Sequence, residues 1–302
     1  MSNPHLSEIV DSAIARRSHL LTAENDLARL IDGAGDELPG IYLETMGGQW
    51  LVSTTDGHLN PELKEILRER APDSLYWKRL DQNQKESPKH LSGPETPEFF
   101  TGIENGLNCR LSFHSGYSQG IFLDQRDNRK KLRELIKPGQ TVLNTFSYTG
   151  FFSIAAAASG ATTSTLDLSQ VYLDWARENF RLNDKDPEEH YFCKGDTFHW
   201  LRRFGKQGRK FDYIILDPPT FSRDDKGKVF RVEKDYSRLF ELALACLTKG
   251  GTILACHNYR GMSTGEFENQ IRACSPQANY QSTEMPADFS ESPYLKSIWV
   301  TT

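Results

Sequence analysis

Apolar and polar residues follow different patterns on either side of Phe122. Before that point, apolar residues form short runs at helical or alternating spacing, separated by turn residues, which predicts a small α+β domain. The expected elements are a helix over 6–14, a hairpin across Gly47-Gly48, a helix that begins at Asn60-Pro61 and a hairpin across Asn105-Gly106. The segment 81–98 has one apolar residue and three prolines, and it predicts a loop or a flexible connection.

After Phe122, short apolar runs alternate with helical stretches, the pattern of a parallel sheet covered by helices. The expected strands span 141–145, 163–166, 191–193, 213–216 and 252–255, and the expected helices span 127–136, 150–158, 171–182 and 236–247. We therefore predict an α/β domain over 101–302 with a doubly wound sheet, preceded by the small domain over 1–100. Ligands in such folds bind at the carboxyl ends of the strands, so the residues after each strand are the candidates for chemistry.

The composition excludes several classes of protein. The 302 residues are 37% hydrophobic, enough for a packed core, and no run approaches the ~18 apolar residues of a membrane span. Since the start also lacks an export signal, we expect a cytoplasmic protein without membrane association. Five cysteines, an odd number with no C-x-x-C pair, indicate reduced thiols and no metal site. A net charge of −5 gives no general attraction to nucleic acid, so such a partner requires a local basic face.

Two basic runs are candidates for that face. The first extends from Arg126 to Arg133, and the second extends from Arg202 to Lys210. Each run can bind phosphates, and each is equally ordinary as the solvated face of a helix.

Acidic residues follow two neighbouring strands of the expected sheet. Asp167 ends the second strand, 20 residues after Ser147 in the turn that follows the first strand. At that distance a carboxylate can accept hydrogen bonds from both ribose hydroxyls of a nucleoside held over the turn. Asp196 follows the third strand and can accept from an adenine amino group. Each acid is also an ordinary helix cap, so both interpretations stay open.

Missing glycine patterns narrow the choice of nucleoside cofactor. The first turn lacks G-x-G-x-x-G and the chain has no G-x-x-x-x-G-K-[ST], which weakens the nicotinamide, flavin and nucleoside triphosphate interpretations. S-adenosylmethionine carries no phosphate, so Gly150 and the small Ser147 can suffice in the turn. The fourth strand runs into Asp217-Pro218-Pro219, where the prolines force an extended turn beside the cofactor, and a rigid structural turn is the alternative.

Three segments resemble class I S-adenosylmethionine-dependent methyltransferases that modify large-subunit ribosomal RNA. They are Gly120 to Arg129, Leu143 to Gly150 and Asp217 to Ser222. The similarity covers about 101–302 and more weakly 34–80, and it extends to both the guanine-N7 and the cytosine-C5 branches. It implies a Rossmann-like fold, enzymatic activity, S-adenosylmethionine as the cofactor and RNA as the partner. Nothing in the chain resembles the PUA domain of the cytosine-C5 branch, so a small-molecule or protein methyltransferase and a non-catalytic RNA or assembly factor remain alternatives.

The residues after the fourth and fifth strands bear on the acceptor. Thr220, not an aromatic residue, follows the two prolines, which argues against an adenine-N6 enzyme. Cytosine C5 requires a thiolate nucleophile, and Cys256 is a candidate, although a small buried hydrophobe is its more ordinary role. The cytosine-C5 branch has its cysteine where this chain has Asn258, and the surrounding segment looks more like the guanine-N7 branch. Guanine N7 carries a lone pair and no proton, so Asn258 and Arg260 need only orient the base. For His257 we favour a hydrogen-bonded structural role over that of a general base.

The strand-end patterns and the resemblance together define the expected site. The expected catalytic positions are Asp217, Pro218, Pro219 and Asn258. The expected cofactor-binding residues are Gln125, Arg129, Asn144, Phe146, Ser147, Tyr148, Thr149, Gly150, Asp167, Leu168, Ser169, Asp196, Thr197 and Asp217.

Overall fold

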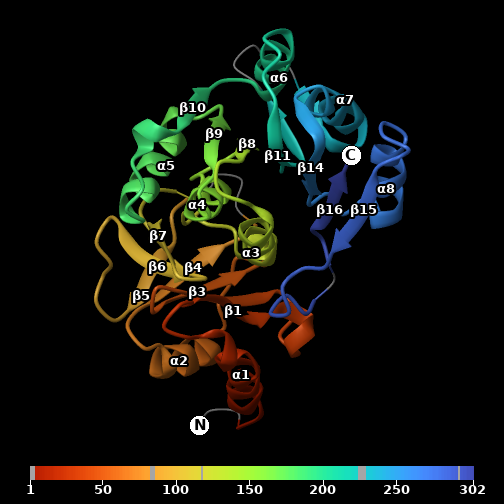
Figure 1. The fold of residues 1–302 in the computed structure, drawn as a ribbon. Helices are drawn as coiled ribbons and strands as arrows, with labels where there is room; N and C mark the ends of the chain where they lie inside the picture. The colour runs from red at the N-terminus through yellow and green to blue at the C-terminus, as the bar shows by residue number, and fades with distance from the viewer. Residues whose placement is uncertain (1–3, 82–85, 117, 224–228, 292) are drawn as a thin grey trace. The chain divides into compact units, whose positions relative to one another are not determined.

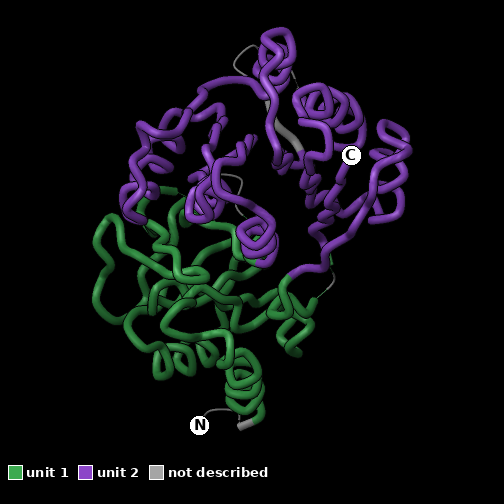
Figure 2. Tube along the Cα trace, viewed as in Figure 1, with its two compact units in different colours: residues 1–126, 286–293 green, residues 127–285, 294–302 purple. Residues whose placement is uncertain are grey.

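The computed structural model describes residues 4–81, 86–116, 118–223, 229–291 and 293–302. The chain divides into two compact units (Figure 2): unit 1 comprises Met1–Arg126 with Pro286–Pro293, and unit 2 comprises Asp127–Met285 with Tyr294–Thr302. These units differ from the expected domains 1–100 and 101–302, because 101–126 and 286–293 belong to unit 1. That the segment 1–100 acts as a domain of its own stays a prediction.

Unit 1 contains a five-stranded sheet in the order β1-β2-β3-β4-β5, in which β3 and β4 pair in parallel and the other neighbours are antiparallel. The strands are β1 (Leu27–Asp32), β2 (Ile41–Met46), β3 (Gln49–Thr54), β4 (Leu75–Arg79) and β5 (Lys89–Ser92). Two helices, α1 (Pro4–Arg17) and α2 (Pro61–Arg70), share one core with the sheet, and β6 (Phe100–Glu104) forms a hairpin with β7 (Leu107–Leu111). Asn60 caps α2 by accepting hydrogen bonds from the backbone of Glu62 and Leu63, with Pro61 in the first helical position. The predicted helices and hairpins of this part are confirmed.

The prediction of a loop over 81–98 is wrong for its middle. β5 occupies 89–92 and pairs with β4 at the edge of the sheet. Its sequence, Lys-His-Leu-Ser, has no apolar alternation, so pairing with the exposed edge of β4 overrides a weak local preference. Residues 82–85 of the predicted loop lie outside the described residues.

Unit 2 contains a seven-stranded sheet in the order β10-β9-β8-β11-β14-β16-β15 (Figure 1). Its strands are β8 (Thr141–Thr145), β9 (Thr162–Asp167), β10 (Tyr191–Lys194), β11 (Phe211–Leu216), β14 (Leu247–His257), β15 (Asn279–Thr283) and β16 (Lys296–Thr301). β8 to β11 and β14 are parallel, whereas β16 is antiparallel to both β14 and β15. The chain enters the sheet at the interior strand β8, proceeds outward through β9 and β10, and then returns to the other side of β8 through β11 and β14. This reversal next to β8 is the switch point at which doubly wound sheets bind ligands.

Helices cover both faces of this sheet, because side chains on successive strand residues point to opposite faces. On one face, Ile214 and Ile253 pack with apolar residues of α6 (Thr197–Lys206), α7 (Val232–Leu244) and α8 (Thr264–Arg272). On the other face, their neighbours Ile215 and Leu254 pack with α3 (Arg126–Leu135) and α4 (Phe151–Ala158). Each such buried aliphatic side chain stabilises the fold by about 1.5–3 kcal/mol. The predicted doubly wound α/β architecture is confirmed.

The five expected strands of this part are confirmed, with β8 matching its predicted bounds. Of the expected helices, the one over 236–247 is wrong at its end, because α7 stops at Leu244 and β14 begins at Leu247. Gly250 and Gly251 therefore lie within the long strand β14 rather than after a helix. The helix over 171–182 is confirmed as α5 (Gln170–Leu182), with Ser169 as its cap.

Candidate active site

The candidate residues lie where the parallel strands end. Backbone pairing aligns Thr145 of β8 with Leu166 of β9 on one side and with Leu216 of β11 on the other. Asp167 in turn pairs with Lys194 at the end of β10. The segments after these strands, which contain most of the expected cofactor-binding and catalytic residues, therefore emerge at the same edge of the sheet, as predicted.

The turn after β8 has an unusual backbone. Phe146, Tyr148 and Gly150 have φ angles of 52°, 50° and 77°, in the left-handed region that residues with a side chain rarely adopt. At Gly150 a Cβ atom would lie 2.7 Å from the Cβ of Ala176 in α5, so both the dihedral angle and the packing require glycine. Such strained residues cluster at binding sites, where the surrounding structure holds them in place.

Asp167 holds this turn. Its Oδ2 accepts a hydrogen bond from the backbone N of Tyr148 at 2.9 Å, and its Oδ1 accepts one from the backbone N of Ser169 at 2.8 Å. Burial raises the pKa of the Asp167 carboxyl, and the backbone N–H groups of Ser169 and Tyr148 act in the opposite direction. The carboxylate thus connects the end of β9 to the turn after β8. Ser169, not Asp167, is the cap of α5.

One polar atom of the turn lacks a partner. The Oγ of Ser147 is buried and has no hydrogen-bond partner among the residues that the structure describes. Its neighbours in the sequence are used by the fold: the Asn144 side chain donates to the Oγ of Ser153 at 3.1 Å, and the carbonyl of Thr149 accepts from Asn179 at 3.0 Å. An orphaned hydroxyl in the turn whose next residue, Tyr148, is bound by the Asp167 carboxylate fits a polar ligand such as a nucleoside.

Asp196 follows β10 and caps α6, since its Oδ1 accepts from the backbone N of His199 at 2.8 Å. The capping interpretation of Asp196 is therefore confirmed. Capping occupies one of its two carboxylate oxygens, so it does not prevent a ligand from donating to the other. A contact of Asp196, Thr197 or Leu168 with the cofactor stays a prediction.

The ends of β11 and β14 are joined by side chains. Thr220 Oγ1 donates to Asn258 Oδ1 at 2.6 Å, which links the segment after Asp217-Pro218-Pro219 to the segment after β14. From α7, the buried hydroxyl of Tyr236 donates to the carbonyl of Leu216 at 3.1 Å and so fixes the last residue of β11 before the prolines. Pro218 is buried, whereas Pro219 and Asn258 are exposed. No local pattern distinguishes Tyr236, because it resembles any other member of the apolar stripe of α7.

Cys256 and His257 lie on opposite faces of β14. Cys256 is fully buried in the core beneath α3 and α4, and its Sγ lies 3.5 Å from the Oγ of Ser297. It therefore has the role of a small buried hydrophobe. His257 is also fully buried, its Nδ1 accepts from the backbone N of Tyr259 at 3.1 Å, and burial together with Lys296 lowers its pKa to about 4. Neither ring nitrogen reaches solvent, which confirms a structural role over that of a general base.

The first basic run is not a single exposed face. Arg126 is 6% exposed and forms a bidentate ion pair with Asp288 at 3.0 and 2.6 Å. Arg129 is 4% exposed, and its guanidinium lies 5.6 Å from the ring centre of Phe152. The interpretation of the whole run as a phosphate-binding or solvated face is therefore wrong for these two arginines. Gln125, in unit 1, is buried as well, and cofactor contacts of Gln125 and Arg129 stay predictions.

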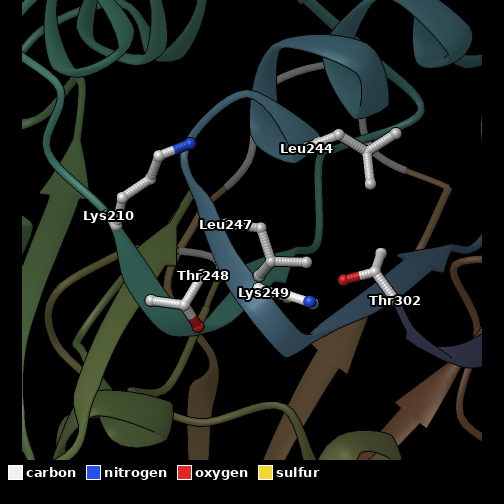
Figure 3. Close-up of a pocket in the computed structure, with 6 residues that line it drawn as sticks. All are labelled: Lys210, Leu244, Leu247, Thr248, Lys249 and Thr302. Atoms are coloured by element: carbon white, nitrogen blue, oxygen red, sulfur yellow. The ribbon is translucent and has the colours of Figure 1, made fainter.

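The second basic run ends at the opposite edge of the sheet, where the strands begin. Arg209 donates to the Oγ of Ser164 at 2.7 Å, and Lys210 donates to the carbonyl of Ala245 at 2.8 Å. A hollow next to Lys210 lies between the starts of β11 and β14 (Figure 3). Its lining comprises Lys210, Leu244, Leu247, Thr248, Lys249 and Thr302. The hollow is therefore distinct from the candidate site at the carboxyl ends.

His, Cys, Asp and Glu side chains within 4–81, 86–116, 118–223, 229–291 and 293–302 form no group of three or more that could hold a metal ion. Over the same residues, every helix is too short or too polar to cross a membrane.

Comparisons with known proteins agree with this geometry. A family model described as S-adenosylmethionine-dependent methyltransferase matches residues 45–293. Ribosomal RNA large subunit methyltransferase K of Neisseria meningitidis is 34% identical over 72% of this chain and 61% of its own length. A ribosomal RNA large subunit methyltransferase of Deinococcus radiodurans is 31% identical over 96% of this chain and 77% of its own.

Among solved structures, SMU.776, described as a methyltransferase and crystallised with SAH, has a TM-score of 0.90 and 28% identity over 100% of this chain and 82% of its own. This chain thus spans less than two thirds of the Neisseria protein but most of the other two. The fold, the strained turn with its half-buried acid and the family model lead to one conclusion: the chain belongs to the S-adenosylmethionine-dependent methyltransferase family.

Proposed function

We propose that the chain transfers a methyl group from S-adenosylmethionine to a base of large-subunit ribosomal RNA, at N7 of guanine rather than C5 of cytosine. The relatives named above support RNA as the substrate. One observation carries the choice of atom: Cys256 is fully buried, and the exposed residue after β14 is Asn258. Methylation at cytosine C5 requires a thiolate that adds to the ring, and this strand end offers no accessible thiol.

On the cofactor side, we assign the nucleoside to the turn after β8 and to Asp167. Each carboxylate oxygen of Asp167 accepts one backbone N–H and keeps a lone pair for a ribose hydroxyl. When bound, S-adenosylmethionine supplies an electrophilic methyl group on a sulfonium. The remaining cofactor-binding positions of this proposal are Gln125, Arg129, Asn144, Phe146, Ser147, Tyr148, Thr149, Gly150, Leu168, Ser169, Asp196 and Thr197.

On the acceptor side, the chain has to position the base and has no proton to remove. The N7 lone pair forms the new bond to the methyl carbon as the bond from sulfur to that carbon breaks, and the electron pair stays on sulfur. Because Asn258 Oδ1 already accepts from Thr220, its amide NH₂ is left to donate to O6 of guanine, next to N7. We assign Asp217, Pro218 and Pro219 to the wall against which the base is oriented. Positioning of this kind supplies most of the rate of an in-line displacement.

The acceptor atom can be tested with modified transcripts. Unmodified large-subunit ribosomal RNA, incubated with the chain and S-adenosylmethionine, should yield 7-methylguanosine in a nucleoside digest analysed by mass spectrometry. The same transcript made with 7-deazaguanosine lacks the acceptor nitrogen and should yield no methylated product. A transcript made with 5-fluorocytidine traps enzymes that add a thiolate to cytosine, so a covalent complex with it would contradict the N7 assignment.

The cofactor site can be tested without RNA. Asp167→Ala removes the acceptor of two backbone N–H groups and of the ribose, so we expect the affinity for S-adenosylmethionine to fall about 100-fold in calorimetric titration. Asp174→Ala is a matched control, because Asp174 is an exposed acid on α5 that pairs with Arg177, and it should bind like the wild type. Wild-type affinity in Asp167→Ala would contradict the site. Normal cofactor binding without methylation of RNA would instead favour a small-molecule or protein acceptor.

A further inference from the structure

A buried lysine and a buried histidine hold the segment that follows β14. Lys296 is 7% exposed and lies opposite His257 in the antiparallel pairing of β16 with β14. Its Nζ donates to the carbonyl of Tyr259 at 2.8 Å and to the carbonyl of Tyr294 at 3.0 Å. His257 Nδ1 accepts from the backbone N of Tyr259 at 3.1 Å. Both polar groups of the Tyr259 backbone are thus engaged by the same cross-strand pair.

The residues on either side of Tyr259 are Asn258, which the proposed function directs at the base, and Arg260, which the sequence predicts to orient the same base. Asn258 is exposed and accepts from Thr220, and Arg260 is exposed with its guanidinium 5.1 Å from the ring centre of Tyr294. Lys296 also donates to the backbone carbonyl of Tyr294. The residue whose ring contacts Arg260 and the residue between Asn258 and Arg260 are therefore held by the same ammonium group. A shift of Tyr259 would therefore move Asn258 and Arg260 together.

This arrangement is poorly explained by stability alone. Because Nδ1 of His257 accepts a hydrogen bond, the proton of the neutral ring lies on Nε2, which is buried and has no partner within the described part of the chain. Among the described residues no carboxylate pairs with Lys296, so its charge is buried against carbonyl groups only. Orphaned donors and unpaired buried charges are retained where the geometry they impose is needed.

We propose that His257 and Lys296 are positioning residues that fix the backbone of Tyr259 and so present Asn258 and Arg260 to the acceptor base. We call the hydrogen bonds of His257 and Lys296 to the backbone of Tyr259 the clamp. The proposal rests on the proposed function for the identity of the base, but the geometry of the clamp does not depend on it. His257 acts through its acceptor nitrogen and Lys296 through its two donated hydrogen bonds, and neither touches the reacting atoms.

Two matched pairs of variants separate positioning from packing. Lys296→Met keeps the aliphatic stem and loses both donors, whereas Lys296→Arg keeps a positively charged group of N–H donors at the end of a long side chain. His257→Phe keeps the ring that packs edge-on against Phe267 but loses the acceptor, whereas His257→Asn keeps an acceptor oxygen near the position of Nδ1 and loses the ring. Thermal melting of all four variants identifies any that fail to fold.

The kinetic experiment compares kcat/KM for RNA with the affinity for S-adenosylmethionine in each variant. We expect Lys296→Met and His257→Phe to lower kcat/KM for RNA by about 10- to 100-fold, the effect of one lost hydrogen bond to a charged or buried group, with the affinity for S-adenosylmethionine unchanged. Lys296→Arg and His257→Asn should recover most of that loss. Unchanged kcat/KM in Lys296→Met, or an equal loss of cofactor affinity, would overturn the proposal.

A second readout does not depend on catalysis. At pH 7, amide hydrogen exchange at Tyr259 should be slow in the wild type and should accelerate at least 10-fold in His257→Phe, while exchange within β14 at that pH stays as in the wild type. Slow exchange at Tyr259 in His257→Phe would contradict the proposal that His257 holds the backbone of Tyr259. If RNA is not methylated by the wild type but the exchange result holds, the proposed function fails and the clamp stands.

Discussion

The buried neutral imidazole of His257 should make unit 2 sensitive to mild acid. Burial and the Lys296 charge lower its pKa from 6.5 to about 4 in the folded chain. Between these values the unfolded chain binds the proton and the folded chain does not, so the free energy of unfolding rises with pH. The stabilising contribution of the neutral His257 imidazole to the free energy of unfolding is therefore fully present above pH 6.5 and is lost as the pH falls toward 4.

The magnitude follows from the difference in pKa. A lowering of about 2.5 corresponds to about 3 kcal/mol when fully expressed, and to about 2 kcal/mol lost between pH 7 and pH 5. That is a large part of the ~5–15 kcal/mol by which domains are stable. Two aromatic groups that face the imidazole do not change charge in this range, because Tyr236 of α7 has its pKa raised well above 10 and Phe267 of α8 is apolar. On β16, burial and then the charge of Arg260 lower the pKa of Lys296 from its ordinary value.

The assay compares the wild type with His257→Phe, which keeps the edge-on ring packing and cannot titrate. Amide hydrogen exchange in β14 reports the free energy of opening of unit 2 itself, which avoids assuming that the two units unfold together. We expect the drop between pH 7 and pH 5 to be about 2 kcal/mol smaller in the variant. Burial also lowers the pKa of His190, but both proteins share that contribution. Equal drops in the two proteins would refute the reasoning, as would a His257 pKa above 6 measured by NMR.

Three other substitutions test the site. Gly150→Ala forces a side chain into the left-handed region and against Ala176, so we expect it to lower the free energy of unfolding by about 1–3 kcal/mol in urea titration and to weaken cofactor binding; full wild-type stability would show that the turn can relax. Tyr236→Phe leaves the carbonyl of Leu216 without its donor, which should cost about 1–3 kcal/mol by the same titration and lower turnover; unchanged values for both would remove Tyr236 from the site. Cys256→Ala should retain turnover within about twofold of the wild type, because no step of the proposed reaction uses the thiol. Loss of turnover in this variant would instead support a covalent mechanism through Cys256.

The sheet of unit 2 could be predicted because each of its parallel strands has a recognisable pattern in its own local sequence. Ile214-Ile215-Leu216 is an unbroken apolar run, as a strand buried on both faces requires, and it is followed by Asp217-Pro218-Pro219, which no strand can continue through. The spacing from the first turn to Asp167 likewise follows from the length of one helix and one strand. The place of Asp167 at the end of β9 could therefore be anticipated, and its contact with a ribose stays a prediction, but its hydrogen bond to the backbone of Tyr148 was not anticipated.

Two of the errors have a different origin, since each depends on a partner far away in the sequence. β14 starts at Leu247 because that residue pairs with Phe211, and this pairing overrides the apolar helical stripe that continues from α7. Arg126 leaves the surface because Asp288, distant in the chain, supplies a buried carboxylate. A sequence read locally contains neither partner, so helix ends and the exposure of charged residues are the features it predicts least well.

The register of β14 determines which of three consecutive residues can take part in chemistry. Cys256 points into the core beneath α3 and α4, His257 points toward Phe267 of α8, and Asn258 follows the last strand residue at the carboxyl edge. A shift of one position would exchange the faces of Cys256 and His257. The antiparallel pairing of His257 with Lys296 opposes such a shift, because it would separate Lys296 from the carbonyl of Tyr259. The same cross-strand pair that positions Asn258 for the base therefore also keeps the only cysteine of this strand out of reach.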